Sequence, residues 1–570
     1  MQRRLEALEE REFDLLVIGA GIFGASAAWD ASLRGLSVAV IDQGDFCSAT
    51  SAHSYKLIHG GLRYLQHGDV YRVRQSAAAR RTFLRIAPHL ARPLPIVVPT
   101  YGYGKKGKPL LRLATAIYDA VTFDRNRGIV DPARRVPGSR TLSRREVLDA
   151  YPGLPSRGLT GAMIFYDGQM YNPPRLVLAF LRSAAAAGAV VANYVSALRF
   201  FSPGDRVAGV EAQDERGGAS LRIRAQVVLN AAGPYAEGLL RRALGQPLDP
   251  PTPWSRDAYF IVRRPLVPGE RALALPAANR DPEAILSRGE RHLFLVPWHG
   301  HTLVGVWHKV HRGPPDAYHV TEAELEAFIG EINAACPALG LSLDDVAQCT
   351  AGLIPFGDNQ ADAPNLKFAH RSRLVDHARE RGLEGLVTLI GVRYTTGPCE
   401  AAEAVDLICR KLRRELAPSR SQVTQLDGGE IDDIEALVDS AQRQHRALPA
   451  QAVRALVHNH GAAYPRVLAG LGDRPELGKT LGSSPVIAAE VVHAVREEMA
   501  LTMADVAFRR TDLATAGDPG EAALRECAAV MAGECGWDQA RTGQELERVR
   551  AQLLGARGPQ LERAAALALA

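Results

Sequence analysis

The sequence has few cysteines and no long hydrophobic run, and each shortage excludes a class of protein. Its seven cysteines are odd in number and scattered, without a C-x-x-C pair, which argues against a disulfide framework or a zinc site and favours a reducing compartment. No stretch approaches the roughly 18 to 20 apolar residues that a membrane span needs, and the initial segment MQRRLEALEEREF is charged where a secretory signal would be apolar. We therefore expect a cytoplasmic protein with no metal site.

A large excess of charge is also missing. The formal net charge is +5 over 570 residues, which is too small to indicate nucleic acid as a partner. A chain of this length exceeds one simple core, so we expect a large mixed domain together with something smaller.

A glycine-rich turn between two apolar strands is the first chemical feature that is present. Residues 15–18 form a short apolar run typical of a buried parallel strand, and the sequence GAGIFG follows at once. Residues 25–33 have helical composition, and a second apolar strand at 38–41 ends in Asp42. This order predicts a complete βαβ unit.

The spacing within this unit predicts dinucleotide binding. Gly19 allows the tight turn, Gly21 lets the backbone approach a pyrophosphate, and Gly24 lets the helix pack closely on the strand. The N–H groups and the partial positive charge at the start of the helix favour phosphate there. Asp42 follows about 20 residues beyond the glycines, where its carboxylate can accept hydrogen bonds from ribose hydroxyls.

Two later segments favour FAD over NAD as the dinucleotide. Residues 225–240 (AQVVLNAAGPYAEGLL) and 385–412 (GLVTLIGVRYTTGPCEAAEAVDLICRKL) each combine an apolar strand, a glycine turn and an amphipathic helix. A cofactor domain that is interrupted by long insertions and completed near residue 410 suits the large two-domain flavoproteins better than a compact NAD domain.

The run SAHSYKLIHGGLRYL at 51–65 gathers cationic side chains around a Gly60-Gly61 pair with few acids nearby. Together with VVLNAAGPYAEGL and the C-terminal AVREEMALTMADVAFRRTDLA and MAGECGWDQAR, it resembles the FAD-dependent glycerol-3-phosphate dehydrogenases and oxidases, which are D-amino-acid-oxidase-like flavoproteins. The resemblance covers about residues 12 to 553. It implies oxidation of sn-glycerol 3-phosphate to dihydroxyacetone phosphate by hydride transfer to flavin N5, with quinone or oxygen as electron acceptor.

The same resemblance assigns residues to the site. It implies that Arg63 holds the phosphate of a small anionic substrate, because a guanidinium has forked donors, and that His59 handles the proton near the reacting carbon. Catalytic roles are expected for His59, Arg63 and Arg393, and substrate contacts for Lys56, Arg63, Tyr64, Tyr259, Ile354 and Arg371. Besides Gly19, Gly21, Gly24 and Asp42, the expected cofactor contacts are Thr50, Ser51, Gly60, Gly61, Gly233, Gly391 and Thr395.

The sequence departs from the family pattern at three pocket positions. Ile354, in AGLIP, stands where the family commonly has an arginine that clamps phosphate, and Arg393 stands where it has a lysine. Tyr259 replaces a histidine, and an unperturbed phenol with a pKa of about 10 is a poorer base near neutrality than imidazole. Arg371 is the candidate to replace the missing guanidinium.

These departures leave other functions open. One alternative is a flavin oxidase or dehydrogenase of an amino or hydroxy acid, in which Ile354 marks a remodelled pocket. Another is a non-catalytic flavoprotein that acts through its C-terminal helices. The oligomeric state is open as well, with a homodimer as one possibility.

The expected fold class is α/β, with a doubly wound FAD-binding part interleaved with an antiparallel-sheet substrate cap, followed by an all-helical C-terminal domain. We expect the oxidoreductase domain at 12–425 and the helical domain at 436–555. In the helical domain, Ser484 is the expected N-cap of one helix, and Thr502 with Asp505 resembles a capping box. Residues 105–123 combine three lysines with an apolar stripe, which indicates either peripheral contact with the inner face of the membrane or an ordinary packed helix.

Overall fold

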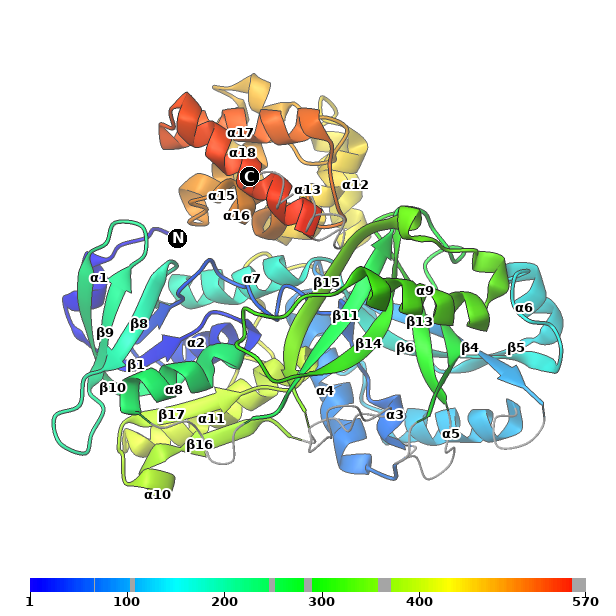
Figure 1. The fold of residues 1–570 in the computed structure, drawn as a ribbon, viewed down its shortest axis with the longest axis horizontal. Coiled ribbons are helices and arrows are strands. Elements are labelled where there is room, and N and C mark those ends of the chain that lie inside the picture. The colour runs from blue at the N-terminus through cyan, green and yellow to red at the C-terminus, as the bar shows by residue number, and fades with distance from the viewer. Residues whose placement is uncertain (66, 103–107, 246–251, 281–289, 357–370, 556–570) are drawn as a thin grey trace.

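A computed structural model describes residues 1–65, 67–102, 108–245, 252–280, 290–356 and 371–555. The chain forms two large sheets and a separate group of helices (Figure 1). None of the helices in these ranges has both the length and the apolar character that crossing a bilayer requires.

The first sheet contains the predicted βαβ unit and has eight strands, with the order β16-β17-β10-β1-β2-β7 and with β8 and β9 extending from β10. Strands β1, β2, β7, β10 and β17 run parallel, and β16 is antiparallel to β17. The strands are β1 (Glu12–Ile18), β2 (Val38–Ile41), β7 (Val190–Ala192), β8 (Val195–Phe200), β9 (Gly209–Asp214), β10 (Ser220–Asn230), β16 (Arg373–Asp376) and β17 (Leu386–Ile390).

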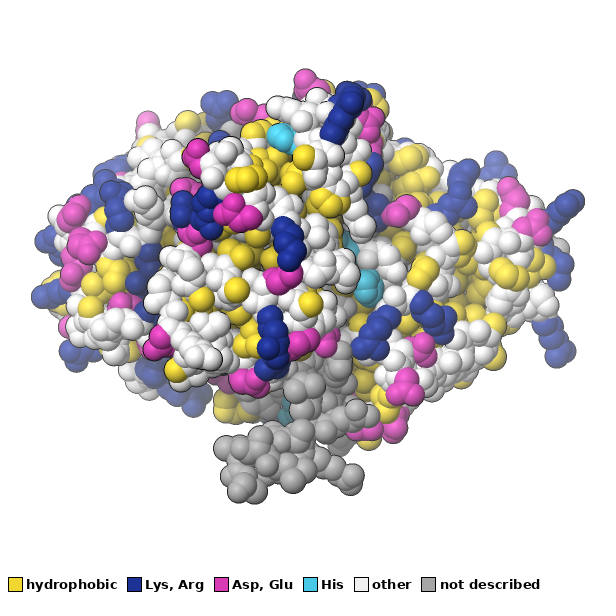
Figure 2. Space-filling view, turned by 90° about the horizontal axis from the view of Figure 1, so that it is seen from above, with side chains coloured by type: hydrophobic (Ala, Val, Ile, Leu, Met, Phe, Trp, Pro, Cys, Tyr) yellow, Lys and Arg dark blue, Asp and Glu magenta, His cyan; other side chains and the backbone are white. Residues whose placement is uncertain are grey.

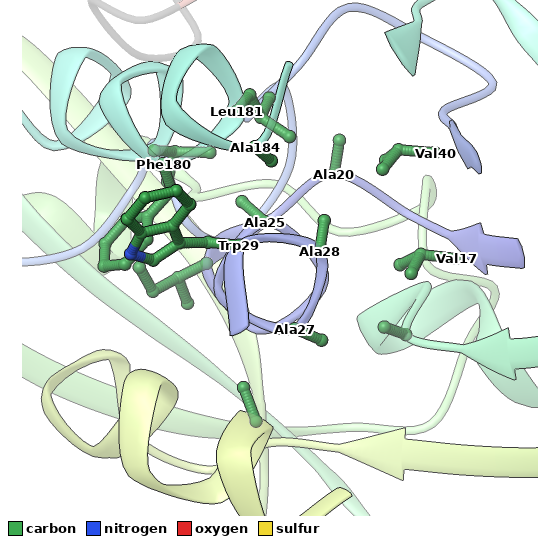
Figure 3. Close-up of a cluster of buried hydrophobic side chains, with 14 of the residues drawn as sticks. Val17, Ala20, Ala25, Ala27, Ala28, Trp29, Val40, Phe180, Leu181 and Ala184 are labelled. Atoms are coloured by element: carbon green, nitrogen blue, oxygen red, sulfur yellow. The ribbon is translucent and has the colours of Figure 1, made fainter. Parts of the chain in front are cut away.

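Helices bury the apolar residues of this sheet. Helix α2 (Ile22–Leu33) contacts both α7 (Pro173–Ala186) and α11 (Gly397–Lys411). Figure 3 shows the contact, in which alanines of α2 and Trp29 pack against Phe180, Leu181 and Ala184 of α7. Small side chains on α2 let the helices approach closely, so the glycine turn is held on a rigid base.

The second sheet has nine strands in the order β15-β11-β14-β13-β12-β4-β6-β3, and β5 pairs with β6. All its pairings are antiparallel except that of β12 with β4. The strands are β3 (Leu57–Ile58), β4 (Ala91–Tyr101), β5 (Arg140–Ser143), β6 (Leu159–Met170), β11 (Trp254–Val262), β12 (Ala272–Arg280), β13 (Glu290–Trp298), β14 (His301–His311) and β15 (Val346–Pro355).

The chain crosses between the two sheets several times, which confirms the predicted interleaving of a dinucleotide-binding part and a cap. The helices of this part of the chain are α1 (Glu6–Glu9), α3 (Leu62–Leu65), α4 (Val70–Ile86), α5 (Lys108–Val121), α6 (Arg144–Ala150), α8 (Ala236–Leu244), α9 (Glu322–Ala335) and α10 (His377–Arg381).

The helices after residue 433 pack on a core of their own, as expected for a C-terminal helical domain. They lie together at the top of Figure 1, and Figure 2 looks onto them from above, where acidic and basic side chains are interspersed. They are α12 (Ile434–Gln444), α13 (Ala450–His460), α14 (Pro465–Leu468), α15 (Ala488–Glu497), α16 (Met503–Asp505), α17 (Glu521–Cys535) and α18 (Gln539–Gly555). The domain boundaries at 425 and 436 stay a prediction.

One predicted cap in this domain is wrong and one is confirmed. Helix α15 begins at Ala488, so Ser484 is not its N-cap. The Ser484 hydroxyl instead donates to the carbonyl of Leu481 in a turn before the helix, and the Glu490 carboxylate accepts from the N–H of Ile487. At α16 the expected capping box between Thr502 and Asp505 is present.

Candidate active site

A single cavity of about 1290 Å³ lies between the two sheets and contains most of the predicted site residues. Its lining comes from the glycine turn, the segment 42–64, strands β6, β11, β14 and β15, and the segment after β17. Pockets for one small molecule usually occupy about 300 to 1,000 Å³. The larger volume suits a site that holds a dinucleotide and a substrate together.

The dinucleotide end is built around the turn from β1 into α2. Gly19 has a φ of +99°, and a Cβ added there would lie 2.7 Å from the carbonyl oxygen of Ala231. A Cβ on Gly21 would lie 3.0 Å from Ser51 Oγ, and one on Gly24 would lie 1.8 Å from the carbonyl oxygen of Gly19. Gly19 and Gly24 therefore have no room for a side chain and Gly21 has little, and Gly19 and Gly21 line the cavity as a pyrophosphate would require.

Asp42 lies in the same cavity at the end of β2. Its carboxylate accepts hydrogen bonds from the N–H groups of Ala20 (2.7 Å) and Gly44 (3.0 Å). Burial raises the pKa of this carboxyl to about 6. Each carboxylate oxygen can accept a second hydrogen bond, so a ribose hydroxyl fits beside these two donors.

Most of the remaining predicted cofactor contacts also lie at the cavity. Thr50 Oγ1 donates to the carbonyl of Leu353 (2.9 Å), and Ser51 Oγ accepts from the N–H of Ile22 (3.0 Å). A Cβ on Gly391 would lie 1.8 Å from the ring of Phe23. The cavity is also lined by Gly61, Gly233 and Thr395, whereas Gly24 and Gly60 are not among its lining residues. Gly60 instead packs on Arg80, whose guanidinium leaves no room for a Cβ.

His59 stands at the cavity with 54% of its side chain exposed. Its Nδ1 lies 3.1 Å from Oδ2 of Asp167, and its backbone N–H donates to Thr395 Oγ1 (3.1 Å). Asp167 lies on β6 and was missed by sequence reasoning. The available signal was its position as the one acid within the otherwise apolar and neutral strand LTGAMIFYDGQM.

Two arginines face the cavity near His59. Arg63 is exposed on α3, and Arg393 follows β17. The Arg393 guanidinium donates to Tyr64 OH (3.1 Å), Ser76 Oγ (3.3 Å) and Gln75 Oε1 (3.2 Å). These partners are neutral and orient the guanidinium, and the nearby buried Glu400 carboxyl interacts with it through space without a described hydrogen bond, so an anion can bind there.

Lys56 was expected to contact the substrate, but it does not lie at the main cavity. It is 5% exposed and is absent from the lining of the main cavity. Its Nζ donates to Tyr259 OH (2.6 Å), lies 4.5 Å from the centre of the Trp298 ring, and faces a second cavity of about 70 Å³. Burial lowers the pKa of Lys56 to about 7 and raises that of Tyr259. Tyr259 lines both cavities.

The side chains around Ile354 differ most from those expected of a phosphate-binding site. Ile354 lines the main cavity from β15, and the neighbouring strands place Asp257 and His308 there, with Asp257 Oδ1 2.8 Å from His308 Nδ1. Arg371, the candidate replacement, is exposed and does not line the cavity. Among the described residues, this part of the cavity therefore presents a carboxylate and an apolar side chain in place of a guanidinium.

A group that could hold a metal exists within the described ranges, but it lies outside the cavity. His460, His493 and Glu498 are buried together between α7 and the C-terminal helices. Arg175 donates to Glu498 Oε2 (2.6 Å) and lies 3.0 Å from His460 Nδ1. The guanidinium thus already lies beside two of the three side chains.

Comparison with known proteins finds similarity over nearly the whole chain. Residues 14–391 match the family of FAD dependent oxidoreductases, and residues 419–542 match the C-terminal domain of alpha-glycerophosphate oxidase. A glycerol-3-phosphate dehydrogenase from Synechocystis sp. is 30% identical over 96% of this chain and 97% of its own length, and glycerol-3-phosphate dehydrogenase 2 of Mycobacterium tuberculosis is 30% identical over 97% and 90%.

A solved structure supports the same fold. The glycerol-3-phosphate dehydrogenase from Bacillus halodurans, in complex with FAD, superimposes with a TM-score of 0.72 over 97% of both chains at 22% identity. The glycine cradle, Asp42 and the cavity volume fit FAD independently of these similarities. The chain therefore belongs, together with the glycerol-3-phosphate dehydrogenases, to the FAD-dependent oxidoreductase family, and FAD is its cofactor.

Proposed function

We propose that the protein oxidises sn-glycerol 3-phosphate, or a closely related small phosphorylated polyol, and that the product from glycerol 3-phosphate is dihydroxyacetone phosphate. The observation that carries this proposal is the pair of cations, Arg63 and Arg393, in the same cavity as His59, with Arg393 oriented by neutral partners. The names of the curated relatives support the same substrate.

The roles of the chain's own residues follow from the bond that is broken. Bound FAD supplies a two-electron acceptor for the hydrogen on the carbinol carbon. Arg63 and Arg393 bind the phosphate and keep the substrate in one orientation, because paired guanidinium donors match phosphate oxygens. His59 receives the hydroxyl proton, and the sheet formed by β11, β14 and β15 covers the cavity and limits access of water.

The test is anaerobic stopped-flow absorbance of the purified flavoprotein. Mixing with sn-glycerol 3-phosphate should bleach the oxidised-flavin band in a saturable, rapid phase. A protein that dithionite reduces but glycerol 3-phosphate does not would contradict the proposed substrate. If no small substrate reduces it, the protein is a non-catalytic flavoprotein, and its C-terminal helices become the surface to study.

A second substrate class is favoured by one observation. Ile354 and the Asp257–His308 pair stand where a phosphate-clamping arginine would be expected, and the Asp257 carboxylate repels a phosphate but attracts an ammonium group. An amino or hydroxy acid could place its carboxylate on Arg63 and Arg393 and its other end near Ile354. Bleaching by such acids, and not by glycerol 3-phosphate, would select this function.

We propose that the electrons then pass to quinone or oxygen. For quinone as the acceptor, the proposal includes peripheral contact of the protein with the membrane. The supporting feature is an exposed apolar patch beside the cavity: α5, which contributes Leu111 and Thr115 to the cavity lining, exposes Leu113 (57%) and Ile117 (44%) on its other side. Tyr71 and Phe123 are exposed nearby on α4 and after α5. Patches of this kind on soluble domains often mark binding surfaces.

Co-sedimentation with anionic lipid vesicles tests this contact. The double substitution L113S/I117S should reduce the bound fraction several-fold, because it removes apolar area from the patch. Leu198→Ser is the matched control, since Leu198 is also exposed but lies on β8, in the other sheet. Equal binding by all three proteins would show that this patch is not the membrane contact, and absence of binding by the wild type would argue for oxygen or a soluble acceptor.

A further inference from the structure

Asp167 contacts two adjacent residues of the segment that carries His59. Its Oδ2 lies 3.1 Å from His59 Nδ1, and its Oδ1 accepts from the backbone N–H of Gly60 at 2.7 Å. Both His59 and Asp167 line the cavity, but 54% of the His59 side chain is exposed against 8% for Asp167. The carboxylate therefore holds the inner nitrogen of an imidazole whose remaining edge faces the cavity.

Groups from every neighbouring element hold this arrangement. Arg80 of α4 is fully buried and its guanidinium lies 4.0 Å from Asp167, so it balances the charge of the carboxylate. Tyr118 of α5 donates to the carbonyl of Gly60 (2.8 Å), and Thr395 accepts from the backbone N–H of His59. The charged groups around the same part of the cavity are Arg63, Asp69, Arg72 and Arg393.

The hydrogen-bond chemistry decides which nitrogen of His59 carries the proton. A carboxylate only accepts, so Nδ1 must be the N–H, and the lone pair of the neutral ring is then on Nε2. We propose that Asp167 is the positioning residue of His59, holding the Nδ1–H tautomer so that Nε2 accepts the substrate's hydroxyl proton. This inference rests on the proposed function for the identity of that proton.

The proton balance is simple. The O–H bond of the substrate breaks and an N–H bond forms at Nε2, while the hydrogen on carbon leaves with two electrons to FAD. His59 becomes an imidazolium, and the Asp167 carboxylate beside Nδ1 stabilises its positive charge. Asp167 does not need to take up a proton itself.

Asp167→Asn tests this role because an amide cannot satisfy both donors. Its single oxygen replaces the acceptor for Gly60 N–H, which leaves the NH₂ group facing Nδ1 and forces the ring proton onto Nε2. We expect kcat for flavin reduction to fall about 100-fold, with KM changed less than about threefold, as for loss of a general base. Asp131→Asn is the matched control, since Asp131 is a buried carboxylate that accepts from two backbone N–H groups, of Ala133 and Ile434, outside the cavity.

A spectroscopic measurement separates this inference from the proposed substrate. Nitrogen-15 NMR of histidine-labelled holoprotein, with the His59 signals identified by their loss in H59Q, should show the Nδ1–H tautomer in the wild-type protein and the Nε2–H tautomer in D167N. His59 in the Nε2–H form in the wild-type protein would overturn the inference, even if D167N did not fold. A wild-type protein that glycerol 3-phosphate cannot reduce, but with His59 in the Nδ1–H form, would overturn only the proposed substrate.

Discussion

Arginines at two places in this protein have opposite kinds of hydrogen-bond partner. At the junction with the C-terminal helices, Arg510 donates to both oxygens of Asp45 (2.7 and 2.8 Å), and Arg509 donates to Asp45 (2.5 Å) and Asp505 (2.6 Å). All four side chains are buried. At the cavity, the described hydrogen-bond partners of Arg393 are a phenol, a hydroxyl and an amide.

The difference separates a structural arginine from one that is available to a ligand. A buried guanidinium with carboxylate partners has its charge compensated inside the protein, and it contributes to attachment of the two domains. Arg393 is oriented by neutral hydrogen-bond partners and has only a through-space attraction to the buried Glu400 carboxyl, so its donors stay available to an anion in the cavity. Asp45 also belongs to the loop that begins at Asp42, which links the C-terminal helices to the cofactor site.

Breaking the interface should have the largest effect. Arg510→Met leaves the buried Asp45 carboxylate without its bidentate partner, which we expect to destabilise the folded protein by roughly 3 to 5 kcal/mol. Because Asp45 lies in the loop after Asp42, the affinity for FAD should fall as well. The melting temperature and the FAD retained after gel filtration measure the two effects.

The control for this substitution is an ion pair in the same domain. Arg454 donates to Glu435 (2.9 Å), and both side chains are about half exposed. Arg454→Met should change stability by less than about 1 kcal/mol, as for other surface pairs. Equal effects of the two substitutions would mean that the buried network does not hold the loop.

Removing the cavity arginine should give the complementary result. Arg393→Met deletes a charge-assisted contact with the substrate anion, worth about 1.5 to 3 kcal/mol, so KM should rise about 10- to 150-fold. The melting temperature should stay close to that of the wild type, because no described hydrogen bond to a carboxylate is lost and only the through-space attraction to Glu400 is removed. A large loss of stability with unchanged KM would place Arg393 among the structural arginines.

An effect that appears only at alkaline pH is expected at a buried acid near the interface network. Glu490 lies with Oε2 4.0 Å from His460 Nε2, its Oε1 accepts from the N–H of Ile487, and the nearest charged groups include Arg175, Glu498 and Asp512. Burial raises its pKa to about 8. A carboxyl whose pKa is higher in the folded than in the unfolded state stabilises fully below its unfolded pKa, and this stabilisation is lost as the pH rises through about 8.

Glu490→Gln keeps the acceptor for Ile487 N–H but cannot ionise. Its melting temperature should be close to that of the wild type at pH 5 and should exceed it by roughly 4 °C at pH 8.5. Thermal unfolding followed by circular dichroism at both pH values measures the gap. Parallel curves for the two proteins would show that Glu490 is not kept neutral by its surroundings.

The dinucleotide half of the site could be predicted because its signals are local. Gly24 is required by its contact with Gly19 inside one βαβ unit, and the spacing of the three glycines appears in a short stretch of sequence, although Gly19 meets Ala231 and Gly21 meets Ser51 outside that unit. The Thr502–Asp505 cap was predictable for the same reason. Ser484 shows the limit of local signals, since the bond it makes to Leu481 is as local as a helix cap, and tertiary packing decides between them.

The substrate half depends on contacts between distant segments. Asp167 meets His59 across 108 positions, and Arg393 meets Tyr64 across 329. Lys56 sits in the same run as Arg63, but its side chain turns to Tyr259 and away from the main cavity. Two residues of one motif can thus face different cavities, and a motif does not show which.

Sequence alone determined the class of cofactor and the strand–turn–helix units that bind it, because periodicity and glycine spacing reflect short-range sterics. Only the tertiary structure decided which charges compensate one another. Arg509 and Arg510 find Asp45 more than 460 positions away, while Arg393 meets neutral partners from α3 and α4. Electrostatic compensation depends on the distance between charges in space. These residues come close to their partners only when both sheets and the C-terminal helices are in place.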